Sequence, residues 1–271
     1  MKTRASLFLA TYEMPKHLEL VFEALLRQSH QEFEVLVCDD GSGEETRQII
    51  QKYAATAPFP IKHFRQEHQG FRKCRILNEA LRQAQGETLV FLDGDCVPHR
   101  HYLLDHVRQQ ETGLYLAGRR VELGEGVSQK LTPEKIRSGY FDFPTPSLLR
   151  SSFWGDTENI QRAFRISNPW LRRKLGMARI DDLKGCNYSV SKADLVAING
   201  FDEDYEGYGR EDTDIELRLQ NLGLRIKSLK GLALQFHVWH PRRDFTPANE
   251  HLLQEVIDTS KIRCRNGLFK E

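Results

Sequence analysis

Short apolar runs alternate with amphipathic helical patterns over the first hundred residues. The runs have strand length and are continuous, which is typical of strands buried on both faces, and they occupy residues 6–10, 34–38, 61–64 and 88–92. Apolar residues at helical spacing fill the gaps at 15–26, 44–55 and 73–84. This β-α-β order predicts an α/β fold with a mostly parallel central sheet flanked by helices, which binds ligands at the carboxyl ends of its strands.

The second half resumes this pattern after an irregular stretch. From residue 122 to 150 the periodicity fades and glycine and proline accumulate, which predicts a long irregular connection that acts as a lid or acceptor loop. The later elements that we expect are a strand ending at Ser191 where a helix opens, a helix at 211–221, strands at 224–229 and 233–238, and a last helix after Pro247.

Composition narrows the class of protein. The 39 basic and 38 acidic residues give a net charge of +1, so no global field favours nucleic acid, and we expect none as a partner. No stretch approaches the roughly 20 apolar residues of a spanning helix. The five cysteines are odd in number and contain no CxxC, which argues against a disulfide framework and a structural zinc site. Free thiols in a reducing cytoplasm fit this pattern.

Two carboxylates follow the apolar run at 88–92, in the sequence Asp93-Gly94-Asp95. Because one glycine separates them, both can face one ligand, and such oxygen ligands suit a hard divalent cation that bridges two phosphates. A solvated Asp-Gly turn is the alternative. The position directly after a buried strand favours a ligand site.

Acidic and basic residues also follow the second and third runs. Asp39 or Asp40 can accept hydrogen bonds from a base or ribose, or can instead cap the next helix. In the segment 70–75, cations lie near a helix N-terminus, which either a bound phosphate or a solvated basic turn would explain, and we expect Arg72 at the phosphate if one binds. Neither G-x-G-x-x-G after the first run nor G-x-x-x-x-G-K-[ST] occurs, which disfavours dehydrogenases and P-loop proteins.

An aromatic residue between glycines and two acids precede the helix predicted at 211–221. Tyr208 offers a flat face to a sugar ring, and Glu211 and Asp212 offer carboxylates to a hydroxyl group. Acids in a first helical turn are also favoured by the helix dipole, and we give Asp214 and Glu216 that structural role alone.

Two histidines and a basic cluster complete the candidates. His237 and His240 follow an apolar strand at a spacing of three, so either can add a metal ligand to Asp95, although a lone histidine is usually structural. Residues 162–179 hold six cations around Trp170, and this cluster either contacts an anionic membrane surface or acceptor, or is a solvated face.

Taken together, the chain resembles glycosyltransferase family 2, whose members have the GT-A fold. The resemblance rests on the order of the segments FLATYEMPKHLELVFEALLRQS, FEVLVCDDGS, GFRKCRILNEAL, FLDGDC, GCNYSVSKADLVAINGFDEDYEGYGREDTDIELRLQNLG and FHVWHP. The later part is similar to β-1,4-galactosyltransferases and chondroitin-type polymerases, in which a G-W-G-x-E-D element carries the catalytic acid. Tyr208 stands here at the tryptophan position, which retains an aromatic platform.

The resemblance implies a role for each candidate residue. Thr11 and Asp39 or Asp40 would hold the nucleoside, Arg72 would lie near the diphosphate, and Asp93 would approach the ribose. Asp95 would bind a divalent cation, Mn²⁺ or Mg²⁺, with His240 and His237 completing the coordination. Asp212 would act as general base, Glu211 would orient the acceptor and Tyr208 would stack on a sugar. A single GT-A domain over 1–271 is implied, with a nucleotide-sugar half at 1–122 and an acceptor-binding, catalytic half at 123–271.

The implied activity is inverting transfer from a nucleotide-diphospho-sugar, mostly a UDP-sugar. The acceptor would be a glycan or lipid-linked saccharide of a surface polysaccharide or lipopolysaccharide, assembled in the cytoplasm or at the cytoplasmic face of the inner membrane, with 162–179 as the peripheral contact. Two alternatives are a sugar nucleotidyltransferase and a catalytically inactive nucleotide-sugar-binding protein.

Overall fold

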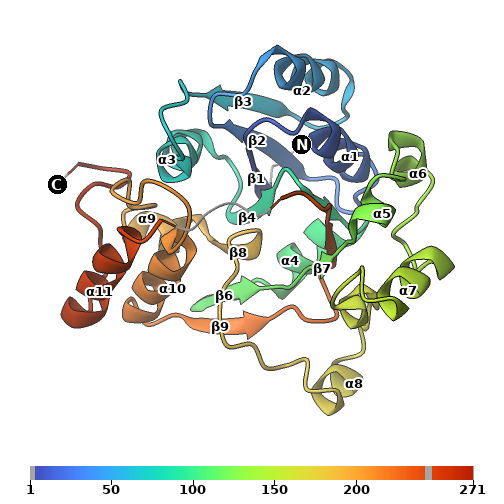
Figure 1. The fold of residues 1–271 in the computed structure, drawn as a ribbon. Helices are drawn as coiled ribbons and strands as arrows, with labels where there is room; N and C mark the ends of the chain where they lie inside the picture. Colours follow the sequence, from blue (N-terminus) through green and yellow to red (C-terminus); the bar gives the residue numbers. More distant parts are fainter. Residues whose placement is uncertain (1–3, 242–245, 271) are drawn as a thin grey trace.

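Seven strands form the central sheet, in the order β3-β2-β1-β4-β8-β6-β9 (Figure 1). The computed structural model describes residues 4–241 and 246–270. The strands are β1 (Ala5–Thr11), β2 (Phe33–Asp39), β3 (Ile61–Arg65), β4 (Thr88–Asp93), β6 (Leu114–Ala117), β8 (Asn187–Ser191) and β9 (Arg225–Ser228). All neighbouring pairs are parallel except those of β8, which runs antiparallel to both β4 and β6. The prediction of a mostly parallel sheet is confirmed.

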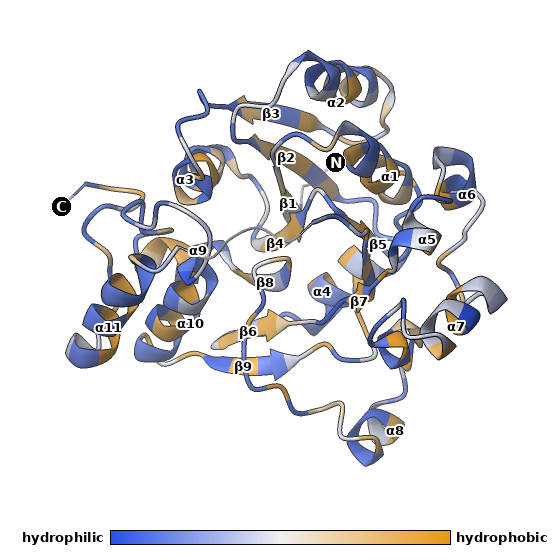
Figure 2. Ribbon diagram, viewed as in Figure 1, coloured by the Kyte–Doolittle hydropathy of each residue, from blue (hydrophilic) through white to orange (hydrophobic). Residues whose placement is uncertain are grey.

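The central strands are apolar on both faces because helices cover both. In β1, Leu7 and Leu9 pack into one hydrophobic cluster, whereas Phe8 packs into the cluster on the opposite face. Figure 2 shows apolar residues concentrated in these strands, whereas outer helices such as α11 are largely hydrophilic. Outside the segment 122–175, the helices of the described residues are α1 (Pro15–Leu25), α2 (Glu44–Thr56), α3 (Lys73–Gln83), α4 (Tyr102–Gln109), α9 (Lys192–Ala197), α10 (Glu211–Asn221) and α11 (Asn249–Thr259). Within the described residues, no helix has the length and apolar character needed to span a membrane.

A second sheet of three short strands lies beside the first. In it, β10 (Gln235–His237) pairs antiparallel with β5 (Cys96–Pro98) and parallel with β7 (Val121–Glu122). The sequence pattern predicted a strand at β10 but not at β5 or β7, because two or three residues are too short to show a period. Both sheets contain strands from residues 1–122 and from residues 123–271, so the two expected halves of the domain share their sheets.

The expectation of an irregular connection at 122–150 was partly wrong. The segment and its continuation hold the short helices α5 (Glu125–Ser128), α6 (Pro133–Arg137), α7 (Pro146–Phe153), η1 (Ile160–Ala163) and α8 (Pro169–Lys174). Helices α6, α7 and α8 each begin with proline, after a capping residue whose side chain accepts a backbone N–H: Thr132, Thr145 and Asn168. These Thr-Pro and Asn-Pro pairs were the available helix signal, but each helix is too short for apolar periodicity.

A buried ion pair anchors α10. Arg218 is 0% exposed, and its guanidinium donates to the Asp214 carboxylate and to the carbonyl oxygens of Ile198 (2.7 Å) and Gly200 (2.9 Å). Asp214 therefore has the structural role expected from the sequence. Because the pair fixes one end of the helix to the α9 turn, it also fixes the direction of the first turn, where Glu211 and Asp212 lie.

We expect Arg218→Met to lower the free energy of unfolding by about 3–5 kcal/mol, because it leaves the Asp214 carboxylate buried without its partner. Urea unfolding followed by circular dichroism measures the loss. Lys52→Met breaks the exposed pair with Glu19 and is the matched control, with an expected loss of about 1 kcal/mol or less. A similar small loss for Arg218→Met would show that the buried pair does not anchor the helix.

Candidate active site

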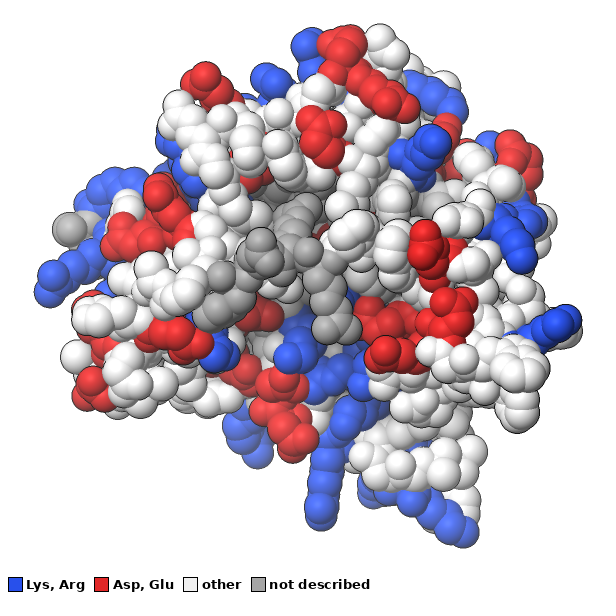
Figure 3. All heavy atoms as spheres, viewed as in Figure 1, with Lys and Arg blue, Asp and Glu red and all other residues white. Residues whose placement is uncertain are grey.

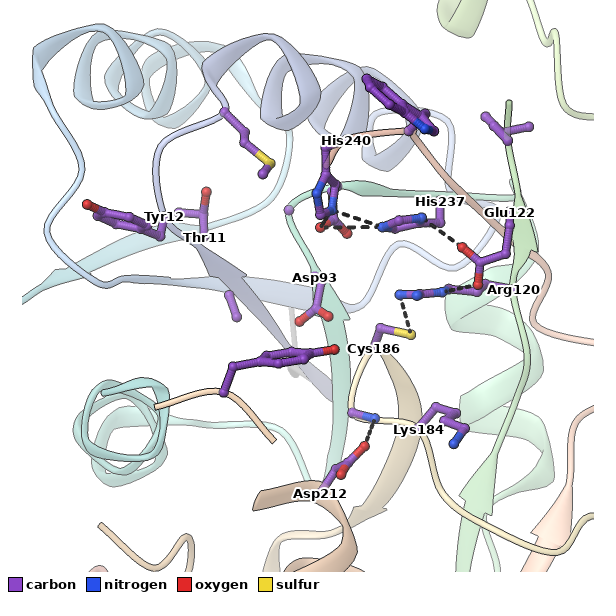
Figure 4. A pocket seen from close by; sticks show the side chains of 18 of the residues that line it. Thr11, Tyr12, Asp93, Arg120, Glu122, Lys184, Cys186, Asp212, His237 and His240 are labelled. Atoms are coloured by element: carbon purple, nitrogen blue, oxygen red, sulfur yellow. Dashed lines mark hydrogen bonds and ion pairs between the residues drawn. The ribbon is translucent and has the colours of Figure 1, made fainter. Parts of the chain in front are cut away.

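A cleft of about 990 Å³ opens at the carboxyl ends of β1 and β4 and beside the second sheet (Figure 4). Most of the residues selected from the sequence line it: Thr11, Asp40, Asp93, Asp95, Tyr208, Glu211, Asp212, His237 and His240. Asp39 and Arg72 are not among the lining residues. The fold thus brings nine of the eleven candidates to one cavity.

Asp39 and Asp40 have different surroundings. The Asp39 carboxylate is buried, accepts from the Ser42 backbone N–H (2.8 Å) and lies 2.9 Å from His63 Nε2, so it holds the turn before α2. The Asp40 carboxylate reaches the cleft and accepts from the Arg72 backbone N–H at 3.1 Å. The Arg72 guanidinium donates to the Glu67 carbonyl oxygen at 2.6 Å, so a phosphate contact by this side chain stays a prediction.

An aromatic pair lies at the same end of the cleft. The rings of Tyr12 and His68 are stacked, with centroids 4.1 Å apart and planes at 12°, and His68 Nδ1 lies 3.0 Å from the Asp40 carbonyl oxygen. Gly41 makes this approach possible, since it has φ +95° and a Cβ atom added to it would lie 2.5 Å from the backbone nitrogen of His68. The sequence analysis did not select Tyr12 or His68.

Lys73 is the cation of the segment 70–75 that points into the cleft. Its Nζ lies 2.8 Å from Asp93 Oδ1. Burial raises the pKa of Glu211, which lies in the same part of the cleft; the positive charge of Lys73 opposes this rise and the negative charge of Asp212 adds to it. Arg72 directly precedes α3, and Lys73 is the first residue of that helix. Because adjacent residues of a helix are rotated relative to each other, their two side chains point in different directions.

Three possible ligand atoms converge near the mouth of the cleft. His240 Nε2 lies 3.1 Å from both Asp95 Oδ2 and His237 Nε2, and His237 Nε2 lies 3.7 Å from Asp95 Oδ2. All three residues are partly buried. Burial acts to raise the pKa of Asp95. The hydrogen bond with His240 and the charge of His237 outweigh this effect and hold the pKa well below its usual range.

The other ring nitrogens define the tautomers of the two histidines. His240 Nδ1 faces the Pro241 carbonyl oxygen at 2.7 Å, and His237 Nδ1 faces Glu122 Oε2 at 2.8 Å. Both partners are acceptors, so we infer that each Nδ1 carries a proton, which leaves each Nε2 free to present a lone pair when a cation binds. Two lone pairs and a carboxylate then face one point, an arrangement that requires added protons or a cation.

Glu122 in β7 and Arg120 just before this strand support the cluster. Arg120 Nε donates to Glu122 Oε1 at 2.7 Å, while the other carboxylate oxygen contacts His237. Burial acts against ionisation of Glu122, but His237 and Arg120 lower its pKa to about 2. A charged carboxylate behind a histidine fixes its tautomer and orientation, as is common around metal ligands.

The first turn of α10 presents the two acids. Asp212 accepts from the Gly185 N–H at 3.1 Å and from the Thr213 N–H at 2.8 Å, and Glu211 accepts from the Gly209 N–H at 3.1 Å. Tyr208 is exposed beside them and meets Phe71 edge to face, with centroids 6.0 Å apart.

Two family models match this chain. Residues 6–173, more than half of the sequence, match the model described as glycosyl transferase family 2, and residues 173–241 match the one described as the N-terminal domain of galactosyltransferase. The chain belongs to glycosyl transferase family 2.

Curated relatives of this family 2 chain include larger proteins. A chondroitin synthase of Pasteurella multocida is 26% identical over 255 residues, which cover 88% of this chain and 25% of the synthase. An uncharacterized glycosyltransferase of Bacillus subtilis is 28% identical over 269 residues, with 88% of this chain and 65% of the relative covered. The chain thus spans a quarter of the first relative and less than two thirds of the second.

Solved structures show that this family 2 chain has the GT-A fold. A mannosyltransferase of Pyrobaculum calidifontis, solved with GDP-Man and Mn²⁺, has a TM-score of 0.62 at 18% identity, with 96% of this chain and 65% of that chain covered. Residues 1–349 of TarS from S. aureus, solved with UDP-GlcNAc, have a TM-score of 0.62 at 19% identity, with 99% and 68% covered. At such identities the likeness concerns the fold alone.

Several lining residues of the family 2 chain were not selected from the sequence. Tyr12 directly follows Thr11 at a strand end, and Lys73 lies within a segment that was selected, so both were within reach. Arg120 and Glu122 lie near or in the two-residue strand β7, and only its pairing with β10 brings them to the cluster.

Proposed function

We propose that the protein is an inverting glycosyltransferase that moves a sugar from a UDP-sugar to a hydroxyl group of a glycan or lipid-linked saccharide. The observation that carries the proposal is a single cleft that contains both the Asp95, His237 and His240 cluster and the carboxylate of Asp212. The first group suits a cation beside a diphosphate, and the second suits removal of a proton from the acceptor.

In this proposal the 1–122 half binds the donor. Thr11 and Asp40 contact the nucleoside, with Asp39 holding the turn behind them, and Asp93 approaches the ribose. Lys73 joins Arg72 as a candidate for the diphosphate, because its ammonium group lies in the cleft beside Asp93. Complexes of two similar folds with GDP-Man and UDP-GlcNAc support a nucleotide sugar as donor.

Asp95, His237 and His240 fit a divalent cation, since their carboxylate and imidazole atoms converge with lone pairs inward and Glu122 orients one ring. The Mn²⁺ complex of a protein of similar fold favours Mn²⁺, and Mg²⁺ is the second candidate. When bound, the cation would neutralise charge on the departing nucleoside diphosphate.

Asp212 is the proposed general base. Backbone N–H groups of Gly185 and Thr213 hold its carboxylate in place, so it can take the proton of an acceptor hydroxyl that attacks the anomeric carbon from the face opposite the leaving group. One displacement inverts the anomeric centre. Glu211, whose pKa is raised by burial, orients the acceptor, and Tyr208 offers its ring to a sugar.

Nucleotide release by purified protein tests the donor assignment. With Mn²⁺ and a panel of UDP-, GDP- and dTDP-sugars, we expect slow release of UDP from one sugar, and loss of that release with a chelator. Added nucleoside triphosphate and sugar phosphate should give no product, which separates this function from that of a nucleotidyltransferase. Absence of both binding and release for every nucleotide sugar would refute the proposal, and binding without release, with any acceptor, would identify an inactive sensor.

We expect Asp212→Asn to reduce transfer by about 10²–10⁴-fold with a nearly unchanged KM for the donor, because it removes the base but retains the shape of the side chain. Initial rates over a range of donor concentrations give both the maximal rate and the KM. Asp181→Asn changes an exposed carboxylate in the loop that leads to Gly185 and is the control. If Asp212→Asn is fully active while Asp95→Ala is inactive, the base assignment is wrong even though the class is right.

We also propose that the protein contacts an anionic membrane surface through α7 and α8. Eight of the thirteen exposed large apolar side chains among the described residues lie at positions 143–175, including Phe143 (81% exposed), Phe153 (81%), Trp154 (73%) and Trp170 (61%). Aromatic side chains beside cations are typical of surfaces that lie in the lipid head-group region. This surface would place the protein at the cytoplasmic face of the membrane, near a lipid-linked acceptor.

The cations of the basic segment 162–179, which suggested this contact, fall into two groups in the structure: those that hold the fold together and those that are exposed. Arg165 pairs with Asp105, and Arg172 donates to the carbonyl oxygens of Lys230 and Ser228, so both serve the fold. The exposed cations are Arg173, Lys174 and Arg179, and residues 159–180 contain no acid. The charge therefore favours anionic lipid over a neutral surface.

Cosedimentation with vesicles tests this contact. We expect binding to phosphatidylglycerol-containing vesicles and weaker binding to pure phosphatidylcholine. Substitution of both Arg173 and Lys174 by Gln should weaken the former by about thirtyfold, at about 1 kcal/mol for each cation. Ile257→Ser, on the distant helix α11, is the control for an exposed apolar residue. No preference for anionic vesicles would refute the contact, and concentration-dependent dimers would assign the surface to a second copy of the chain.

A further inference from the structure

Arg162 places a guanidinium group in the cleft without a carboxylate partner. The residue belongs to η1, is half-buried and lines the cavity. Its Nη1 donates to the Arg120 carbonyl oxygen at 3.0 Å, and in the described part of the chain no carboxylate oxygen lies within 4.0 Å of its guanidinium. A partly desolvated charge is costly unless an opposite charge compensates it, so the position favours an anion in the cleft.

Two neighbouring cations add to the positive charge around Arg162. Arg119 and Lys184 both line the cleft, and both pair with the one carboxylate of Asp182, with Lys184 Nζ at 2.7 Å. Burial and the positive charge of Arg119 lower the pKa of Arg162, which agrees with their close approach. Figure 3 shows Lys and Arg atoms gathered below the centre of this face.

The other nearby acids do not neutralise Arg162. Glu122 is already engaged by Arg120 and His237. Asp156 and Glu158 also line the cleft, but both are exposed at its rim, where water screens their charge, and Asp156 accepts from Ser151 Oγ at 2.9 Å. A ligand anion thus remains the partner that the position of Arg162 favours.

This group of cations, Arg119, Arg162 and Lys184, lies at the acceptor end of the cleft. Lys184 directly precedes Gly185, whose N–H donates to Asp212 Oδ2 (Figure 4). Asp182, which joins Arg119 to Lys184, belongs to the same segment. The cations therefore adjoin the carboxylate that we propose as the base, whereas Lys73 and Asp93 hold the donor side.

We propose that the acceptor saccharide carries an anionic group, a carboxylate or a phosphate, that Arg162 binds with Arg119 and Lys184 beside it. The planar guanidinium fork matches the paired oxygens of either group. The inference rests on the proposed function, because it identifies the substrate of the same site. It predicts that uronic acid or sugar phosphate units are present next to the hydroxyl that is glycosylated.

The test compares three small sugars on protein saturated with UDP and Mn²⁺. Methyl β-glucuronide, glucose 6-phosphate and the neutral methyl β-glucoside are titrated by isothermal calorimetry. We expect one of the two anionic sugars to bind about tenfold to a hundredfold more tightly than the glucoside, which also distinguishes carboxylate from phosphate. Arg162→Gln should abolish this preference and Arg162→Lys should retain part of it. Arg108→Gln, at an exposed residue outside the cleft, should have no effect.

Three results would overturn the inference. These are equal affinities for the three sugars, no measurable binding by any of them, or a loss of UDP affinity in Arg162→Gln, which would place the guanidinium at the diphosphate. Nucleotide release by the unmodified protein distinguishes failure of this inference from failure of the proposed function. A protein that releases UDP but does not prefer anionic sugars is still a transferase, with a neutral acceptor.

Discussion

The pairing of β10 with β5 and β7 is the constraint on which the cleft depends. Its register places His237 opposite Cys96, the neighbour of Asp95, and opposite Glu122. The Val238 N–H also donates to the Asp95 carbonyl oxygen at 2.8 Å. Three segments that are far apart in the sequence are thus fixed by backbone hydrogen bonds. Because ordering costs about 1–2 kcal/mol per residue, a site whose backbone is ordered by folding loses less free energy when it binds a ligand.

Charges in the cleft are compensated in two separate groups. Lys73 faces Asp93, and Arg120 compensates Glu122, which in turn orients His237. These two carboxylates, Asp93 and Glu122, therefore have a positive neighbour before any ligand arrives, which limits the cost of desolvation. The Asp95, His237 and His240 cluster and the guanidinium of Arg162 differ from these ion pairs. In the cluster a negative charge is left uncompensated, and at Arg162 a positive charge is. The first favours a cation and the second an anion, which are the charges that our proposals assign to them.

The sequence predicted the elements whose signal is local. The continuous apolar runs gave β1 to β4 to within a residue or two, and the first acids gave α10 with the same bounds as in the structure. Strand ends gave the carboxylates because parallel strands must end at one edge. The sequence did not indicate positions that depend on pairing between distant segments, as for Glu122 on β7, or on the helical rotation between adjacent residues, by which Lys73 and not Arg72 lines the cleft. Apolar periodicity contains no information on either.

The orientation of Asp212 depends on contacts outside the cleft. The chain enters α10 through Gly209 (φ 113°) and Arg210 (φ 76°), and a left-handed conformation costs a residue other than glycine about 1–3 kcal/mol. Helix α11 compensates this strain, since Glu250 pairs with the Arg210 guanidinium and Asn249 Nδ2 donates to the Gly209 carbonyl oxygen at 2.7 Å. The buried Arg218 then fixes the far end of the same helix. A turn that is strained locally but held from both sides has one available geometry, so the carboxylate that we propose as the base is positioned before an acceptor binds.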